Sequence, residues 1–172
     1  MSIHHIQLWV PDLHRSERSW GWLLSELGYQ VVRRFDHGRV WRDGDGVSST
    51  GIVIEQSPDM VPGMLHSRLR PGMNHIAFRL PTTERLEQLV GEASEHGWRT
   101  LDGGIHHPLQ GRPTIAYLED HDGFEVELIG PSQDGVHIDT DEDIGRGTID
   151  DNGATTSDTK STTSSATTGG DR

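Results

Sequence analysis

Two short stretches of this chain share one alternation of hydrophobic and polar positions. Residues 5–11 read His-Ile-Gln-Leu-Trp-Val-Pro, and residues 75–81 read His-Ile-Ala-Phe-Arg-Leu-Pro, 75 − 5 = 70 positions later. In both stretches every second side chain is aliphatic or aromatic, and a proline closes the run. A period of two residues ended by a proline predicts a β-strand with one apolar face.

Each predicted strand is followed by residues with a helical period, in which apolar side chains recur every three or four positions. The two apolar stripes are Trp20, Leu23, Leu24 and Leu27 in the first half, and Leu86, Leu89, Val90 and Ala93 in the second. Asp12 is placed to cap the first helix, and Gly28 and Gly97 are placed to end the two helices. Strand, helix and stop therefore occur twice in the same order.

Three further strands are predicted in each half. They cover residues 29–35, 38–43 and 51–56 in the first half, and residues 98–102, 114–118 and 124–129 in the second. The chain is therefore predicted to be an α+β protein built from two βαβββ modules, a duplicated unit. Repeat one spans residues 1–56, a connector spans 57–73, and repeat two spans 74–131.

Composition adds a tail and excludes several functions. Residues 132–172 are rich in Asp, Ser, Thr and Gly, and such a segment is predicted to be disordered. The 172 residues carry a net charge of −12 and no cysteine, which excludes disulfides and zinc–thiolate sites. An acidic chain gains nothing from nucleic acid or an anionic membrane. No apolar run approaches the roughly 20 residues of a membrane span, so a cytoplasmic protein is expected.

Candidate chemistry lies on the polar faces of the repeated strands. His5 and His75 oppose the apolar faces of their strands, and so do Glu55, Glu125 and Glu127 in the strands that close the two halves. A single strand histidine is usually structural, but here histidines and glutamates recur at matching positions of a repeat. Two imidazoles and two carboxylates suit a divalent ion such as Ni, Zn, Mn, Co or Fe(II).

With these segments the chain resembles the vicinal oxygen chelate superfamily, which includes glyoxalase I and the bleomycin and fosfomycin resistance proteins. The matching segments are residues 5–13, residues 74–78 and residues 118–129, Leu-Glu-Asp-His-Asp-Gly-Phe-Glu-Val-Glu-Leu-Ile. The last is similar to the family's Asp-Pro-Asp-Gly turn, with His121 where proline is usual. The resemblance implies two βαβββ modules that form an open, cupped mixed sheet around a metal cleft.

The resemblance also implies a site. The metal ligands would be His5, Glu55, His75 and Glu127, a set similar to that of bacterial glyoxalase I. The metal would act as a Lewis acid that stabilises an enediolate or oxyanion of a small substrate with vicinal oxygens. The implied function is a metal-dependent, glyoxalase I-like lyase or isomerase/epimerase that acts by proton transfer, with Glu127 as the catalytic base and Glu55 opposite. Small family members commonly pair two chains, so the resemblance implies a homodimer.

Gln7, Trp9, Trp41 and Arg79 are candidates to line the substrate pocket. Two other functions stay open. One is a non-haem Fe(II) dioxygenase or a resistance transferase that uses only His5, His75 and Glu127. The other is a metal-free ligand-binding protein of the bleomycin resistance type.

Overall fold

The computed structural model of the protein describes residues 3–44, 50–107 and 112–132. The predicted tail, 132–172, lies outside the described residues except for Ser132. No helix of the described part is long and apolar enough to cross a membrane.

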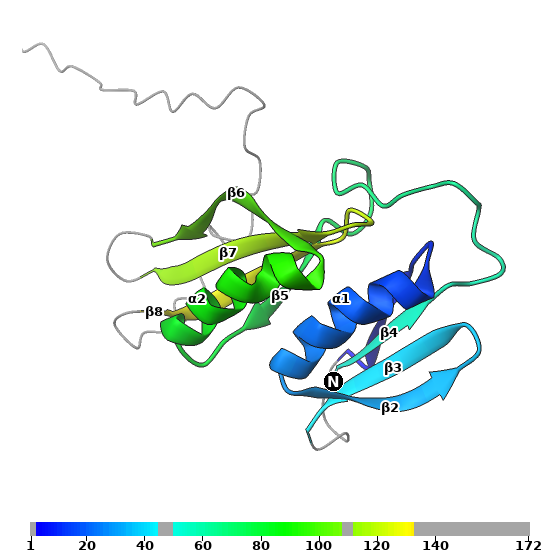
Figure 1. The fold of residues 1–172 in the computed structure, drawn as a ribbon, viewed down its shortest axis with the longest axis horizontal. Coiled ribbons are helices and arrows are strands. Elements are labelled where there is room, and N and C mark those ends of the chain that lie inside the picture. Colours follow the sequence, from blue (N-terminus) through cyan, green and yellow to red (C-terminus); the bar gives the residue numbers. More distant parts are fainter. Residues whose placement is uncertain (1–2, 45–49, 108–111, 133–172) are drawn as a thin grey trace, which may run out of the picture. The chain divides into compact units, whose positions relative to one another are not determined.

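The first module contains one helix and a four-stranded mixed sheet (Figure 1). Its elements are β1 (His5–Trp9), α1 (Leu13–Glu26), β2 (Tyr29–Phe35), β3 (Gly38–Asp43) and β4 (Gly51–Glu55). The strand order is β1-β4-β3-β2, in which β1 and β4 are parallel and the other pairs are antiparallel.

The second module repeats this topology with the strand order β5-β8-β7-β6. Its elements are β5 (His75–Arg79), α2 (Thr83–Glu92), the short 3₁₀ helix η1 (Ala93–His96), β6 (Trp98–His106), β7 (Pro113–Asp120) and β8 (Glu125–Ser132). Parallel β5 and β8 lie side by side, as β1 and β4 do in the first module. The predicted α+β fold of two βαβββ modules is confirmed.

The local signals for the helix ends are confirmed as well. The Asp12 side chain accepts a hydrogen bond of 2.9 Å from the Arg15 backbone N–H and so caps α1. Gly28 and Gly97 adopt φ angles of 87° and 84°, a region that glycine enters without steric cost. The first helix therefore begins after Asp12, and the helical segments of both modules end before the predicted glycines, the second through the short 3₁₀ helix η1.

Strand β6 is longer than predicted. It runs to His106, four residues beyond the predicted end at residue 102. Asp102, Gly103 and Gly104 all have positive φ, and the pairing with β7 shifts register between Thr100 and Ile105. This irregularity breaks the two-residue alternation, which is why the second half of the strand is not recognisable from the pattern of apolar residues.

The apolar faces of the sheets and the helices form one hydrophobic core. Trp20 of α1 is completely buried and contacts Trp98 and Phe124 of the second module edge-on, with ring centroids 5.1 and 6.4 Å away. Edge-to-face contacts of this kind stabilise aromatic pairs beyond their burial. The two modules therefore share their core through helix α1.

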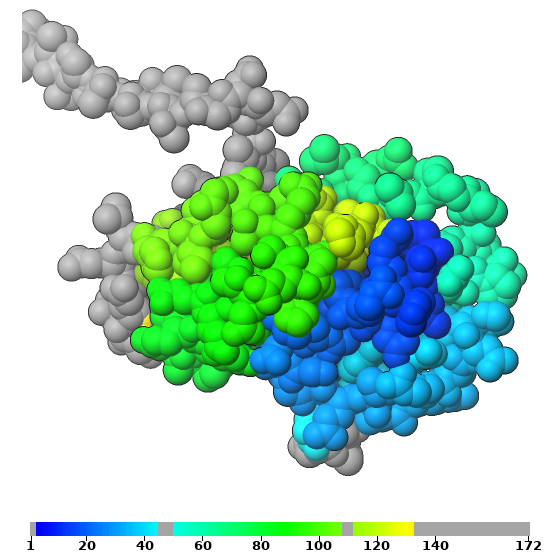
Figure 2. All heavy atoms as spheres, in the orientation of Figure 1, coloured from blue at the N-terminus to red at the C-terminus, as the bar shows by residue number. Residues whose placement is uncertain are grey.

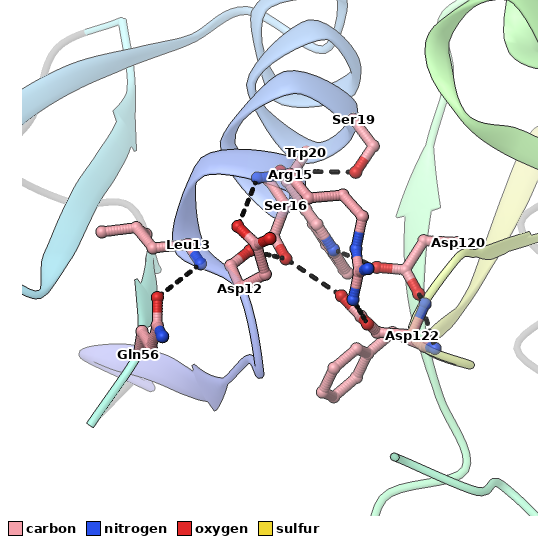
Figure 3. Close-up of polar contacts among 10 residues, drawn as sticks. Asp12, Leu13, Arg15, Ser16, Ser19, Trp20, Gln56, Asp120 and Asp122 are labelled. Carbon is pink, nitrogen blue, oxygen red and sulfur yellow. Dashed lines mark hydrogen bonds and ion pairs between the residues drawn. The ribbon is translucent and has the colours of Figure 1, made fainter. Parts of the chain in front are cut away.

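Polar contacts join the same surfaces around the turn between β7 and β8 (Figure 3). The Asp120 carboxylate accepts hydrogen bonds from Trp20 Nε1 at 2.9 Å and from the backbone N–H groups of Asp122 and Phe124 at 2.8 and 2.9 Å. Burial raises the pKa of Asp120, and these hydrogen bonds oppose that rise. The turn that resembles the family's Asp-Pro-Asp-Gly segment is thus held by the helix of the other module.

Asp122 adds a second link between the modules. It accepts a hydrogen bond of 3.1 Å from Ser16 Oγ and forms an ion pair with Arg15, both on α1 (Figure 3). The Asp122 side chain is 1% exposed, so removal of Ser16 or Arg15 leaves one oxygen of a buried carboxylate without its partner. The two aspartates of this turn therefore have structural roles.

Candidate functional site

The second module brings His75 and Glu127 into contact. The two residues lie on the neighbouring parallel strands β5 and β8, where Glu127 pairs with Ala77, two positions beyond His75. His75 Nε2 is 3.2 Å from Glu127 Oε2, and the side chains are 26% and 14% exposed. The diagonal placement on one face of the sheet is what allows the two side chains to meet.

Asn74 fixes which ring nitrogen of His75 carries the proton. Its Oδ1 lies 2.7 Å from His75 Nδ1, and because an amide oxygen can only accept, Nδ1 must be protonated. When the ring is neutral, Nε2 and the Glu127 carboxylate therefore face each other as two acceptors. Such a pair requires a positive charge between them, which a proton or a metal ion can supply. The donor set therefore fits a metal ion.

The electrostatics of His75 follow from this contact. The hydrogen bond with Glu127 raises the pKa of His75, and the partial burial of the imidazole opposes the rise. In the metal-free protein the positive charge between the two side chains is accordingly a proton at low pH.

We call the contact of His75 with Glu127 the half-site of the second module. Tyr117 is its third member, and the sequence analysis did not predict it. Its hydroxyl donates a hydrogen bond of 3.0 Å to Glu127 Oε1, and its ring lies edge-on to His75 at 6.0 Å. Burial and the nearby Glu127 raise the pKa of Tyr117 well above its usual range, so the hydroxyl stays a donor. Tyr117 alternates with the buried Ala116 and Leu118 on β7. That alternation places Tyr117 on the polar face of the sheet and is the sequence signal by which it could have been found.

The connector supplies one wall of the half-site. Arg68 Nε lies 2.8 Å from Glu125 Oε2, and Asn74 Nδ2 donates a hydrogen bond of 3.2 Å to the Arg68 backbone carbonyl. The Glu125 side chain is 5% exposed; burial raises its pKa, and the charge of Arg68 opposes the rise. Asn74 therefore ties the connector to His75.

The connector also contacts the β7–β8 turn, and Figure 2 shows it running over the surface of the molecule. The His66 ring stacks on Phe124 with centroids 4.4 Å apart. Gly123 has φ 85°, and an added Cβ there would lie 2.6 Å from the His66 carbonyl oxygen. The close approach of the two backbones requires glycine at this turn.

The first module carries the corresponding histidine in different surroundings. His5 is exposed, and its Nδ1 lies 2.8 Å from Nδ1 of His4. His4 Nε2 in turn lies 3.0 Å from Nη2 of Arg42. On the same face, the Gln7 amide donates a hydrogen bond to the Glu55 carboxylate. Among the contacts of the described residues, none joins His5 directly to Glu55 in the way that His75 contacts Glu127.

Strand register explains the difference. His5 pairs with Gly51 and Glu55 pairs with Trp9, so Glu55 lies four positions beyond the partner of His5. In the second module Glu127 lies only two positions beyond the partner of His75. The structural counterpart of Glu127 is therefore Val53, at an offset of 127 − 53 = 74, so the prediction that Glu55 and Glu127 occupy matching positions of the repeat is wrong by two residues.

The predicted ligands form two separate pairs within one chain. His5 and Glu55 belong to the first module, and His75 and Glu127 belong to the second. Among the residues that the structure describes, no three His, Asp or Glu side chains form a group that could hold a metal ion. The four-ligand set stays a prediction, and it requires ligands from a second copy of the chain.

The predicted pocket residues differ in their exposure. Gln7, Trp9 and Arg79 lie on exposed faces, and Trp9 is 46% exposed. Trp41 is 1% exposed and lies in the core, because its β3 position pairs with the core residue Ile52. Trp41 is thus not placed to line a pocket on the polar face.

Comparisons with known proteins agree with the fold. A family model described as the glyoxalase/bleomycin resistance protein/dioxygenase superfamily matches residues 4–117. The uncharacterized protein YqjT of Bacillus subtilis (strain 168) is 33% identical over 132 residues, which cover 76% of this chain and 99% of YqjT.

Two solved structures add to this likeness. A candidate glyoxalase from Bacillus halodurans is 28% identical, with a TM-score of 0.65 over 75% of this chain and 95% of its own. The fosfomycin resistance protein FosX of Listeria monocytogenes is 19% identical and shares the fold, with a TM-score of 0.57 over 78% of this chain and 97% of its own. The resemblance found in the sequence is confirmed: because the family model matches more than half of its length, this chain belongs to the glyoxalase/bleomycin resistance protein/dioxygenase superfamily.

Proposed function

We propose that this chain is a metal-dependent lyase or isomerase that moves a proton between neighbouring carbons of a small substrate with vicinal oxygens. The observation that carries the proposal is the contact of His75 with Glu127 at 3.2 Å, with the Nδ1 proton held by Asn74. A histidine that donates one N–H to a fixed acceptor and directs its other nitrogen at a carboxylate is arranged as a metal ligand.

In this proposal His75 and Glu127 hold a divalent ion, with His5 and Glu55 as further ligands. When bound, the ion supplies Lewis-acid stabilisation of negative charge on the substrate oxygens. The chain's own part is orientation and proton movement. Tyr117 holds Glu127 Oε1, which directs Oε2 toward His75 and the open face of the sheet. Glu127 is thereby positioned to take a proton from the substrate.

The proposal includes a homodimer. The two ligand pairs lie on different modules, and no group of three potential ligands forms among the described residues of one chain. The polar face of β1, with Trp9 46% exposed, is open to a second surface. In a two-fold dimer, module one of each chain can face module two of the other, which supplies two equal sites.

A second candidate function is supported by the register of the first module. Glu55 lies four strand positions beyond the partner of His5, about 13 Å along the sheet. That separation favours a three-ligand set of His5, His75 and Glu127. Such a set suits an Fe(II) dioxygenase or a metal-dependent resistance transferase.

Metal analysis followed by a substrate panel tests both candidates. The chain is purified without chelators, its metal content and solution mass are measured, and hemithioacetals, acyl-CoA thioesters and catechols are assayed. His75→Gln is expected to lose the metal, whereas the control His14→Gln, in an exposed position of α1, is expected to keep it. Turnover of hemithioacetals or thioesters supports the lyase or isomerase, and turnover of catechols supports the dioxygenase. A chain that binds no metal and turns over none of them overturns the proposal and favours the metal-free ligand-binding alternative.

A further inference from the structure

We propose that the two repeated histidines are held in different tautomers. His75 presents an unprotonated Nε2 with a lone pair, whereas His5 presents an Nε2 that carries a proton. This inference rests on the proposed function for His75 and Glu127, and it replaces the metal-ligand role of His5 with the role of a hydrogen-bond donor. It assigns Asn74, His4 and Arg42 as positioning residues.

The argument for His75 begins at the connector. The Asn74 amide is held at both ends, because Nδ2 donates to the Arg68 carbonyl at 3.2 Å and Oδ1 lies 2.7 Å from His75 Nδ1. A flip of the amide would place its oxygen against the Arg68 carbonyl oxygen and lose that hydrogen bond, so the amide oxygen stays directed at the imidazole. The neutral ring is then protonated at Nδ1, and Nε2 carries the lone pair that a metal ion requires.

The argument for His5 begins at Arg42. A guanidinium can only donate, so His4 Nε2, 3.0 Å from Arg42 Nη2, is the acceptor. A neutral His4 therefore carries its proton on Nδ1. His4 Nδ1 lies 2.8 Å from His5 Nδ1, so it donates and His5 Nδ1 accepts. The neutral His5 ring then has its proton on Nε2.

The chemical consequence is a division of labour. A nitrogen that bears a proton cannot coordinate a metal. His5 Nε2 therefore becomes a ligand only if the hydrogen bonds from Arg42 to His4 and from His4 to His5 are broken, so that the proton can move to Nδ1. In this tautomer the Nε2–H of His5 can instead donate a hydrogen bond to a substrate. A neutral imidazole N–H directed at a substrate oxygen stabilises negative charge that develops there. His75 and Glu127 are then the main holders of the ion.

The first test reads the tautomers directly and requires neither metal nor substrate. Long-range ¹H–¹⁵N correlation spectra are recorded on the metal-free full-length chain at alkaline pH, where imidazoles are neutral. The expected result is His75 protonated at Nδ1 and His5 protonated at Nε2. His5 protonated at Nδ1, or His75 at Nε2, overturns the inference.

Variants separate positioning from simple structural roles. Asn74→Ala is expected to release His75 into a mixture of tautomers, and Asn74→Asp, which keeps an acceptor at the same place, is expected to restore the Nδ1–H form. Arg42→Met is expected to release His5 and to leave His75 unchanged. Equal spectra for wild type and Asn74→Ala contradict the role of Asn74.

The second test measures affinity for Zn²⁺ by competition with a chromophoric chelator. Loss of an outer partner of a metal-bound histidine typically costs about 10–100-fold, so Asn74→Ala is expected to weaken binding by that factor and Asn74→Asp to restore it. Arg42→Met is expected to bind Zn²⁺ as tightly as wild type or more tightly. Weaker binding by Arg42→Met overturns the division of labour. Correct tautomers without Zn²⁺ binding contradict only the proposed function, whereas Zn²⁺ binding with the wrong tautomers contradicts only this inference.

Discussion

The two modules share a topology but differ in how far their polar faces are organised. In the second module His75, Glu127 and Tyr117 contact one another, and the connector closes one side through Arg68. In the first module His5 is exposed and contacts only its neighbour His4 in the described hydrogen bonds. A duplicated backbone therefore holds one preorganised half-site and one open half-site. Preorganisation of this kind is what catalysis and metal binding require.

The largest expected effect tests whether the organised half carries the chemistry. Glu127→Gln keeps the size of the side chain but removes the base, and a general base typically contributes about 10²–10⁴-fold to turnover. We expect a loss of that size with the substrate identified by the panel. The matched change in the open half, Glu55→Gln, is expected to cost much less. Steady-state kinetics together with metal analysis measure both, and a fully active, metal-loaded Glu127→Gln would end the base assignment.

A second comparison concerns two of the tryptophans of the first module, the buried Trp20 and the exposed Trp9. Trp20→Ala removes a completely buried ring that contacts the second module, and such changes typically cost about 3–5 kcal/mol of unfolding free energy. Trp9→Ala removes a ring that is 46% exposed and should cost much less. Urea unfolding of both variants provides the measurement. Equal losses would show that Trp20 does not join the modules.

The pH dependence of stability is expected to come from the organised half. Contact with Glu127 raises the pKa of His75 in the folded state. A raised folded-state pKa means that its contribution is fully present below the unfolded pKa and is lost as the pH rises through the folded one. In metal-free protein, Glu127→Gln should therefore lower stability more at acidic pH than at alkaline pH. Urea unfolding of wild type and Glu127→Gln across a pH series measures the loss of unfolding free energy. A larger loss at alkaline pH than at acidic pH would contradict the prediction.

The smallest effect is expected for removal of the tail. A chain that ends after Ser132 loses a segment with few large apolar side chains, so both modules should keep their stability. We expect an unchanged midpoint of thermal unfolding and unchanged activity. A broadened or lowered transition would show that the tail packs against a module.

The alternation of apolar residues was sufficient to predict the fold. It placed both repeats, and Asp12 and Gly97 marked helix ends where the structure has them. It also assigned His75 and Glu127 to one polar face. Glu55 was matched to the wrong position because the spacing of two glutamates does not reveal strand register, which backbone pairing decides.

Trp41 and Tyr117 show what the pattern misses. Trp41 belongs to a six-residue strand with too few apolar residues to define its inner face, and the structure buries it. Tyr117 has a polar end and an apolar ring, so its role depends on Glu127 across the strand pair. Such side chains are identified by their partners, which a sequence without register does not supply.

The contact between Trp20 and Asp120 also has a consequence for synthesis of the chain. The two residues are 100 positions apart, so the partner of Trp20 does not exist until most of both modules has been translated. At about 5–20 residues per second, helix α1 waits roughly 5–20 s with its central indole uncovered. During that interval we expect the nascent first module to expose apolar surface of the kind that chaperones recognise. Slower translation between the modules should therefore increase dependence on those chaperones.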